Sequence, residues 1–333
     1  MTERQTRREG RGETISARSA LAAGRRSLSL RRIWPLLAAV CLLIGVMAGG
    51  GQAGAATKRI LVLTSGEESS GQEALAGIRN HGTGVPVDSV HSDPKSDEML
   101  VTALAQNNRD TAVITLGTKA QRLVVRAAPS GPVVHCLTPS ASDAAAAANA
   151  FVVPNEVPVE ARLTWLKRLL PRARNVGLLF DPVTNASRAQ EELGALRRGG
   201  FAAFPEPVSA HTALPPALAR LAGTIDVVHA ISDKTALPPE SRKPLFLFSF
   251  RNKIPISGPT EEWVRAGALF AVTWDFAEVG AYCAALAVRA LKEGKNPMPA
   301  PPRPRVTVNL NTATQIGLRW DAGLLRTVDR VYP

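Results

Sequence analysis

The chain has 333 residues, of which 45% are hydrophobic and 20% charged, and its formal net charge is +12. This composition is that of a folded globular protein, and it excludes both a disordered chain and a polytopic membrane protein. The chain is longer than a single hydrophobic core usually supports, so two lobes of roughly 100 to 150 residues each are expected.

The first 56 residues are predicted to be a signal peptide. Residues 1–33 contain nine arginines and three glutamates, and an apolar run from Trp34 to Val46 follows them. Small residues come next, with Ala53-Gly54-Ala55 as a cleavage site, which completes the order of a secretory signal. The apolar run is shorter than the roughly 20 residues that span a bilayer. We therefore expect export to a periplasmic or other extracytoplasmic location.

Removal of this segment changes the charge and hence the expected partners. It leaves 31 basic and 25 acidic residues, or +6. These charges are spread thinly, whereas nucleic-acid binders keep dense Lys/Arg clusters interleaved with aromatic residues. Nucleic acid is therefore not expected as a partner. Arg31-Arg32 leaves twin-arginine export open beside Sec export, and a start codon further downstream is also left open.

The first part of the remaining chain alternates short β-rich runs with helical stretches, which indicates a parallel sheet covered by helices. Strands are predicted at Arg59 to Thr64, Val85 to Val90, Thr111 to Leu116 and Pro132 to Leu137. Helices are predicted between them, at Gly71 to Arg79, Asp97 to Gln106 and Lys119 to Ala127. The alanine-rich stretch Ser140 to Asn149 offers no bulky residue to a core and is interpreted as a boundary.

The alternating pattern then restarts. Helices are predicted at Pro158 to Leu170, Ala186 to Arg198, Pro215 to Leu221, Pro239 to Arg251 and Phe276 to Leu291. Strands are predicted at Val176 to Phe180, Phe201 to Val208, Ile225 to Ile231, Ile254 to Ser257 and Val306 to Leu310, the last followed by a short tail. The fold class is therefore α/β, with two doubly wound parallel-sheet lobes.

The two lobes are expected to be discontinuous in sequence. Lobe 1 comprises 57–154, with 271–297 returning to it, and lobe 2 comprises 155–270, with 298–333 returning to it. Cys136 and Cys283 remain after cleavage. They could pair in an oxidising compartment. The end of a strand and the interior of a helix are also places where buried free thiols are common, and this second interpretation is favoured.

Polar and glycine-containing turns follow several strands, which is where ligands bind in open parallel sheets. The candidates are Ser65, Gly117, Thr118, Thr138, Asp181, Asn185 and Asp233. Gly117 admits close approach of a ligand to the backbone and Thr118 can cap the next helix, although plain turns have the same composition. Trp274 and Asp275 bring an indole and a carboxylate together, either to contact a ligand or to fill the interface between lobes.

Catalytic signatures are absent from the sequence. The stretch Gly66 to Gly71 lacks the spacing of a nucleophile elbow, and there is no phosphate-binding loop. The histidines, at 81, 91, 135, 211 and 229, are dispersed, and none has metal-ligand spacing. No enzyme activity, cofactor or metal is expected.

Several segments carry a resemblance to a known family, namely Val157 to Arg174, the following NVGLLFDP and TNAS, Asp226 to Asp233, Lys253 to Ser257, Val264 to Leu269, Val279-Gly280, and Val308 to Ala313. In this order, the sequence from about 155 to 333 resembles the ABC-transporter substrate-binding family, which includes bacterial tryptophan- and aromatic-amino-acid-binding proteins. The resemblance implies a type I periplasmic-binding-protein fold with two lobes that close on a ligand about a hinge.

The resemblance also implies the site and the partners. Ligand contacts are expected from the strand-end candidates and Asp275. The expected function is that of a monomeric binding protein that passes a small polar solute, such as an amino acid, to an ABC permease. The alternatives are a non-transport envelope sensor or degenerate relative that contacts another envelope protein, and, with less support, an envelope enzyme.

Overall fold

The computed structural model describes residues 57–66, 69–138, 149–294 and 300–333, all of which belong to one compact unit, Ala53–Pro333. The predicted signal peptide lies outside the described residues, as does the alanine-rich boundary apart from Asn149. None of the helices in the described ranges combines the length and the apolar character needed to cross a membrane.

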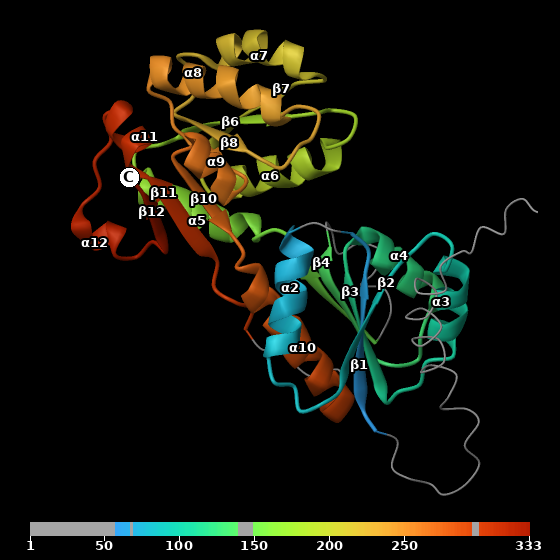
Figure 1. Cartoon of the computed structure of the whole chain (residues 1–333). Coiled ribbons are helices and arrows are strands. Elements are labelled where there is room, and N and C mark those ends of the chain that lie inside the picture. Colours follow the sequence, from blue (N-terminus) through green and yellow to red (C-terminus); the bar gives the residue numbers. More distant parts are fainter. Residues whose placement is uncertain (1–56, 67–68, 139–148, 295–299) are drawn as a thin grey trace, which may run out of the picture. The chain divides into compact units, whose positions relative to one another are not determined.

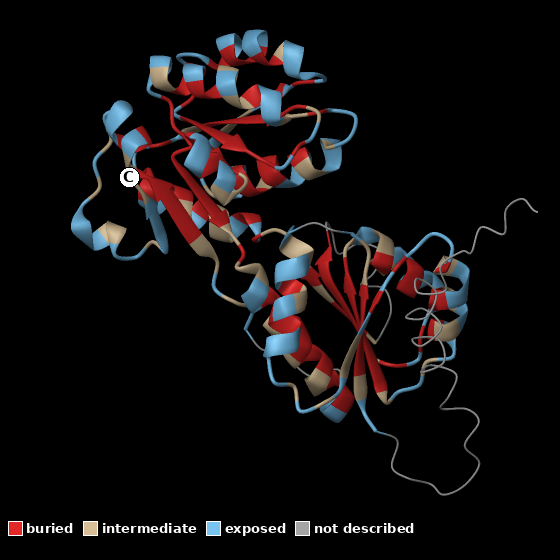
Figure 2. Ribbon diagram, in the orientation of Figure 1, coloured by how far each residue is buried: buried red, intermediate tan, exposed pale blue. Residues whose placement is uncertain are grey.

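The first lobe is built on a parallel sheet with the strand order β2-β1-β3-β4-β5. Its strands are β1 (Arg59–Thr64), β2 (Val87–His91), β3 (Thr111–Leu116), β4 (Val133–Thr138) and β5 (Ala150–Pro154). Its helices are α2 (Ser69–Asn80), α3 (Asp97–Ala105), α4 (Thr118–Ala127) and α10 (Phe276–Glu293). Figure 1 shows α2 and α10 on one face of the sheet and α3 and α4 on the other. Because both faces are covered, β3 and β4 are buried along their whole length (Figure 2).

The second lobe is built on a sheet with the order β12-β11-β10-β9-β8-β6-β7, in which β10 and β11 pair antiparallel. Its strands are β6 (Asn175–Phe180), β7 (Ala202–Pro207), β8 (Val227–Ala230), β9 (Ile256–Gly258), β10 (Phe270–Thr273), β11 (Arg305–Asn309) and β12 (Arg330–Tyr332). Its helices are α5 (Val159–Leu169), α6 (Ala186–Arg198), α7 (Leu214–Leu221), α8 (Arg242–Asn252), α9 (Glu261–Ala266), α11 (Leu310–Gln315) and α12 (Ala322–Leu325), with short 3₁₀ turns η3 (His211–Ala213) and η4 (Pro239–Ser241). The predicted α/β class with two parallel-sheet lobes is confirmed, with one antiparallel pair added among the described strands.

The sequence did not predict three short strands, each of which is defined by its pairing partner. The five residues of β5 follow the alanine-rich stretch and become a strand only by pairing with β4. Strand β10 pairs with β9 and β11, so residues 271–273 stay in the second sheet and the chain leaves it only at Trp274. The expected C-terminal tail contains α11, α12 and β12, and the three residues of β12 pair with β11.

The return of the chain to the first lobe depends on a close crossing of α10 and α2, which lie side by side in Figure 1. A Cβ atom built on Gly280 of α10 would lie 1.9 Å from the carbonyl oxygen of Ala74 in α2. A Cβ atom on Gly77 of α2 would lie 2.0 Å from the carbonyl oxygen of Ala277 in α10. Since these contacts are with backbone atoms, no side-chain rotation relieves them. The two helices can approach this closely only with glycine at both positions.

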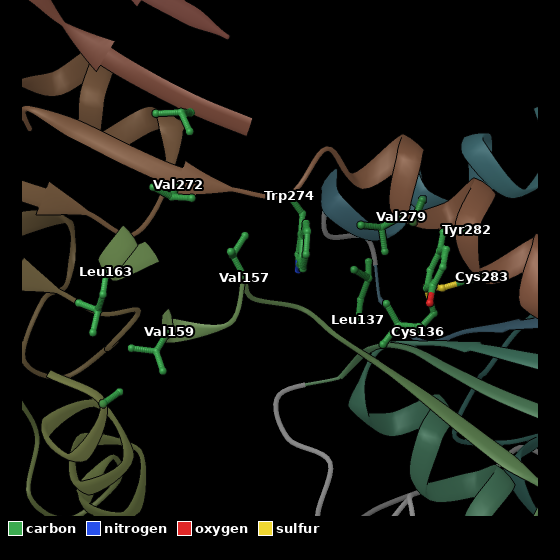
Figure 3. Packing of buried hydrophobic residues seen from close by; sticks show 14 of the residues in the cluster. Cys136, Leu137, Val157, Val159, Leu163, Val272, Trp274, Val279, Tyr282 and Cys283 are labelled. Atoms are coloured by element: carbon green, nitrogen blue, oxygen red, sulfur yellow. A yellow bond between two sulfur atoms is a disulfide. The ribbon is translucent and has the colours of Figure 1, made fainter. Parts of the chain in front are cut away.

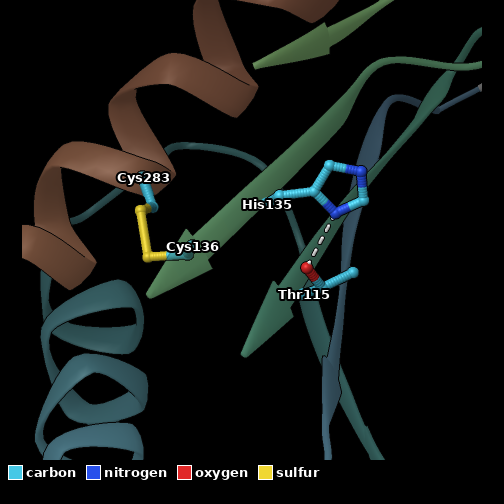
Figure 4. Close-up of a disulfide and its surroundings, with 4 residues drawn as sticks. All are labelled: Thr115, His135, Cys136 and Cys283. Carbon is cyan, nitrogen blue, oxygen red and sulfur yellow. Dashed lines mark hydrogen bonds between the residues drawn. A yellow bond between two sulfur atoms is a disulfide. The ribbon is translucent and has the colours of Figure 1, made fainter. Parts of the chain in front are cut away.

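A disulfide between Cys136 of β4 and Cys283 of α10 overturns the favoured free-thiol interpretation (Figure 4). The two residues are 147 positions apart, and their Cα atoms lie 6.4 Å from each other because α10 packs over β4. In Figure 3, Val279 and Tyr282 of α10 face Leu137, the neighbour of Cys136. The disulfide therefore joins the returning helix covalently to the sheet that it covers.

His135, next to the disulfide, is a buried part of this core (Figure 4). Its Nδ1 atom lies 3.0 Å from the hydroxyl oxygen of Thr115. Burial lowers the pKa of His135 to about 4, so the imidazole is neutral at pH 7.

The glycine crossing predicts a strong effect of adding one methyl group. Gly280→Ala forces α2 and α10 apart and is expected to cost about 2 to 4 kcal/mol of unfolding free energy. Gly71→Ala is the matched control, because no heavy atom of the described residues lies within 4 Å of a Cβ at this position of α2. It should be neutral or slightly stabilising, since alanine favours helix. Denaturant unfolding of both variants checks this, and equal stabilities would contradict the close crossing.

The disulfide predicts a stability that depends on redox conditions. A cross-link that closes a loop of this length is expected to contribute about 2 to 5 kcal/mol, so Cys136→Ala/Cys283→Ala should unfold at lower denaturant concentration. Dithiothreitol should destabilise the wild-type protein and leave this variant unchanged. Peptide mapping without reduction that finds both cysteines as free thiols would show that the bond does not form.

Candidate functional site

A cavity of about 610 Å³, here called the strand-end pocket, lies at the carboxyl ends of strands in the second sheet. Its wall includes His229 to Ser232 at the end of β8, Ser257 to Thr260 at the end of β9, and Thr273 to Phe276 after β10. The first lobe contributes Ser69, Ser70 and Glu73 from the start of α2. The volume is in the range of small-molecule sites, and this edge of a parallel sheet is where such sites form.

Five arginines from five different elements line the strand-end pocket. They are Arg162 of α5, Arg188 of α6, Arg265 of α9, Arg305 of β11 and Arg330 of β12. The lining also contains five carboxylates, namely Glu73, Glu156, Glu261, Glu262 and Asp275. Arg188 forms an ion pair with Glu156, and Arg305 forms one with Asp275. The wall therefore presents both signs of charge in nearly equal number.

Arg162 and His229 of this wall form a charge cluster with Glu192, which is buried and does not line the pocket. Arg162 makes an ion pair with Glu192 and donates from Nε to the carbonyl oxygen of Val157, at 3.0 Å. His229 Nε2 lies 3.1 Å from Oε2 of Glu192, and Nδ1 of the same ring has no hydrogen-bond partner among the described residues. Only 3% of Glu192 and 1% of His229 are exposed. The cluster ties α5, α6 and β8 together beneath the pocket.

The carboxylate of Glu192 is held in its charged form. Burial by itself would raise its pKa, but the hydrogen bond from His229 and the charges of His229 and Arg162 outweigh burial and lower the pKa to about 2. Arg162, which lines the pocket, is thereby fixed in position by a carboxylate that does not line it.

A second polar cluster joins α9 to the C-terminal strand. Glu261 pairs with Arg330 and accepts a hydrogen bond from the hydroxyl of Tyr332, and Arg265 lies 3.7 Å from the same carboxylate. Burial alone would raise the pKa of Glu261, but the hydrogen bonds from Tyr332 and Arg330 together with the arginine charges lower it. Strand β12, which the sequence did not predict, is thus the element that delivers Arg330 to the pocket.

Two of the residues singled out from the sequence, Trp274 and Asp275, line the strand-end pocket. Asp275 caps α10 by accepting hydrogen bonds from the backbone N–H of Ala277, at 3.0 Å, and Glu278, at 3.2 Å. Trp274 is 6% exposed, lies close to Val157 in Figure 3, and its Nε1–H has no partner within the described ranges. The indole both lines the pocket and packs in the core, so the two interpretations of Trp274 do not exclude each other.

The candidates after β6 and β8 lie in a local network and outside the pocket lining. Asp181 accepts hydrogen bonds from Thr184 Oγ1, at 2.6 Å, and from the backbone N–H of Val183, at 3.0 Å, and these bonds lower its pKa. Asp233 accepts from the backbone N–H of Asp181, at 2.7 Å. Asn185 donates to Thr184 Oγ1, at 3.2 Å. In this structure, these side chains form hydrogen bonds that stabilise the turns after β6 and β8.

The candidates of the first lobe also lie outside the pocket lining. The Ser65 hydroxyl accepts from the backbone N–H of Ala120, at 3.0 Å, and lies 3.3 Å from the carbonyl oxygen of Leu116. Gly117 has φ +94°, and a Cβ atom there would lie 2.9 Å from the Ser65 hydroxyl oxygen, so the turn requires glycine before Thr118. Thr138 is fully buried, and its hydroxyl has no partner in the described part of the chain.

The sequence contained no signal for the pocket arginines. Each lies in a helix or a short strand, where a solvated charge is the usual interpretation of a basic residue. Their common location arises only from the order of strands in the second sheet. In the described ranges, no group of three His, Cys, Asp or Glu side chains is arranged to hold a metal ion.

The buried charge cluster predicts that Glu192→Gln destabilises the protein by about 3 kcal/mol, because Arg162 loses its counter-charge in a buried place. Glu160→Gln is the matched control, since the Glu160–Arg198 pair is 68% exposed on both sides and should be worth less than about 0.5 kcal/mol.

The same cluster predicts a dependence on pH. The pKa of Glu192 is lower in the folded state than in the unfolded state, so its contribution is complete above about pH 4.5 and is lost as the pH falls towards 2. Urea unfolding between pH 7 and pH 3 checks both points. A Glu192→Gln variant with the stability and acid sensitivity of the wild type would contradict them.

Solved structures similar to this chain are bacterial binding proteins. The ABC domain from Streptococcus pneumoniae in complex with L-Trp has a TM-score of 0.56 and 18% identity, over 83% of this chain and 100% of that one. The ligand-free, open structure of a substrate-binding protein with adhesive properties from Clostridium difficile has a TM-score of 0.69 and 17% identity, over 83% and 99%. A periplasmic ribose ABC transporter protein from Conexibacter woesei has a TM-score of 0.55 and 16% identity, over 84% and 100%.

These likenesses show the fold, that of type I periplasmic binding proteins, as the resemblance implied. No curated protein sequence matches this chain at a significant level. Residues 88–331, which are most of the chain, match the protein family described as "ABC transporter substrate binding protein". Members of that family bind solutes and are not enzymes. The match confirms the resemblance seen in the sequence: this chain belongs to the ABC transporter substrate-binding protein family.

Proposed function

We propose that this protein is the extracytoplasmic solute-binding component of an ABC-type importer and that it binds a small polar molecule, such as an amino acid, in the strand-end pocket. The observation that carries this proposal is the position of the pocket at the carboxyl edge of the second sheet, with α2 of the first lobe contributing to its wall. In this family a cavity of this size and place is suited to the transported solute.

The charges of the lining favour a solute that itself carries both signs of charge. Arginines paired with Glu156 and Asp275 offer donors to a carboxylate. Glu73 and Glu262, which form no ion pair within 4 Å among the described residues, offer acceptors to an ammonium group. Trp274 adds an aromatic surface next to them. An amino acid combines these properties, which is why we prefer it to an uncharged sugar.

In this proposal the ligand contacts come from Trp274, Asp275 and the pocket arginines. The other candidates from the sequence do not line the pocket, so we assign them no direct contact with the ligand. The edge of the first sheet is shaped by Ser65, Gly117, Thr118 and Thr138. The edge of the second sheet is shaped by Asp181, Asn185 and Asp233.

The partners and the location follow from the same proposal. The segment 1–56 directs export to the periplasm or another extracytoplasmic space, and the mature protein delivers its solute as a monomer to an ABC permease. No cofactor takes part. A protein that binds no solute would instead fit the non-transport sensor or degenerate relative that the sequence left open.

A thermal-shift screen of the purified protein against amino acids and other small metabolites tests the proposal. A ligand at 100 times its dissociation constant should add roughly 2.7 kcal/mol of stability and raise the melting temperature. A screen in which no compound raises the melting temperature would count against the importer function.

Two isosteric variants then test the location of the site. Asp275→Asn keeps the helix cap but loses the ion pair with Arg305, so the ligand-induced shift should fall sharply. Glu160→Gln is the matched control, because Glu160 is exposed and does not line the pocket, and its ligand-induced shift should equal that of the wild type. The reverse result would place the ligand away from the strand-end pocket.

A further inference from the structure

A second cavity, of about 620 Å³, lies at the opposite edge of the second sheet and is here called the basic pocket. Its wall includes Ala173 ahead of β6, Asp226 ahead of β8, and Lys253 and Pro255 ahead of β9. The loop from Ile316 to Asp321, between α11 and α12, completes the wall. No residue lines both pockets, so the basic pocket is separate from the strand-end pocket.

The charges of the basic pocket are not balanced. Four cationic side chains line it, those of Arg168, Arg172, Lys253 and Arg319, and none of them has an ion-pair partner among the described residues. Arg168 instead stacks on Trp165, with its guanidinium carbon 4.3 Å from the ring centroid, and donates to Thr327 Oγ1 at 3.2 Å.

The two carboxylates of the lining are already used by backbone N–H groups. Asp226 accepts from Arg174 N, at 2.7 Å, and from Asn175 N, at 2.8 Å. Asp321 caps α12 by accepting from Leu324 N, at 2.7 Å. The cavity therefore keeps an excess of positive charge that the lobe itself does not neutralise.

The floor of the basic pocket is apolar. Leu169, Leu170 and Ile316 are buried there, and Leu318 and Leu324 are partly exposed. The indole of Trp320 is held in the lining by a hydrogen bond from Nε1 to the carbonyl oxygen of Leu169, at 2.8 Å. A bare anion would gain little here, because exposed cations bind weakly and are screened by salt. An anion with an apolar body would also remove this floor from water.

We propose that the basic pocket is a second binding site, for a carboxylate or phosphate group that carries an apolar chain. The cations bind the anionic head, and the leucines and Trp320 contact the chain. A free metabolite and the head of an anionic lipid share this chemistry. Because the site lies at the amino edge of the sheet, it acts independently of solute binding at the carboxyl edge.

Titration of the purified protein with hexanoate tests the soluble form of the ligand, with binding followed by calorimetry and tryptophan fluorescence. Acetate and 1-hexanol supply the head and the chain separately, and both should bind more weakly than hexanoate. Sedimentation with phosphatidylglycerol vesicles, compared with phosphatidylcholine vesicles, tests the lipid form. Binding of hexanoate or of phosphatidylglycerol vesicles supports the second binding site and shows whether its ligand is a free metabolite or a lipid. If neither binds, the proposed site is overturned.

Charge-removing variants locate the binding. Arg172→Ser/Arg319→Ser should bind the active probe roughly tenfold more weakly, since about 1.4 kcal/mol is lost with two exposed cations. The matched control, Lys243→Ser/Arg251→Ser, removes two exposed cations of α8 in the same lobe that line neither pocket. Its affinity should stay within about twofold of the wild type. Equal losses in both variants would indicate general charge attraction and overturn the site.

The response of the strand-end pocket separates this result from the proposed function. A solute found in the thermal-shift screen should raise the melting temperature of Arg172→Ser/Arg319→Ser as it does that of the wild type. Loss of that response together with probe binding would overturn the independence of the two pockets.

Discussion

The crossing of α2 and α10 is the contact on which the first lobe depends. The chain leaves this lobe after β5, builds most of the second, and returns at α10, so the first lobe is complete only when α10 docks. Gly77 and Gly280 let the two backbones meet, and the Cys136–Cys283 disulfide fixes the docked helix to β4. Both helices begin at the strand-end pocket, where α2 contributes Ser69 and Asp275 caps α10. The crossing that completes the core thus also positions part of the strand-end pocket.

The arrangement of charged side chains differs between the two edges of the second sheet. At the carboxyl edge, arginines and carboxylates pair with one another, and the buried Glu192 fixes Arg162 and His229 in the wall of the pocket. If the proposed function holds, a solute bound there contacts a set of side chains with equal numbers of arginines and carboxylates. At the amino edge, backbone N–H groups donate to Asp226 and Asp321, and the cations around them have no ion-pair partner among the described residues. The first arrangement suits a zwitterion and the second an amphipathic anion.

Local sequence patterns determined much of the architecture. The predicted bounds of β1, β3 and α6 coincide with the observed ones, because a continuous apolar run or a regular amphipathic repeat needs no partner to be recognised. The alternation of these elements predicted two parallel-sheet lobes, and the resemblance from residue 155 onward predicted the family. The same patterns also predicted that Trp274 and Asp275 stand together at the start of α10.

Tertiary structure decided the rest, since the remaining features depend on residues far apart in the chain. Strands β5, β10 and β12 have three to five residues each and are strands only because a neighbour offers hydrogen bonds. The disulfide depends on the return of α10 over β4. The pocket arginines come from five elements that only the strand order of the second sheet brings to one edge. A sequence records the residue types and their local order, whereas a binding site is made by the contacts that the fold creates between distant segments.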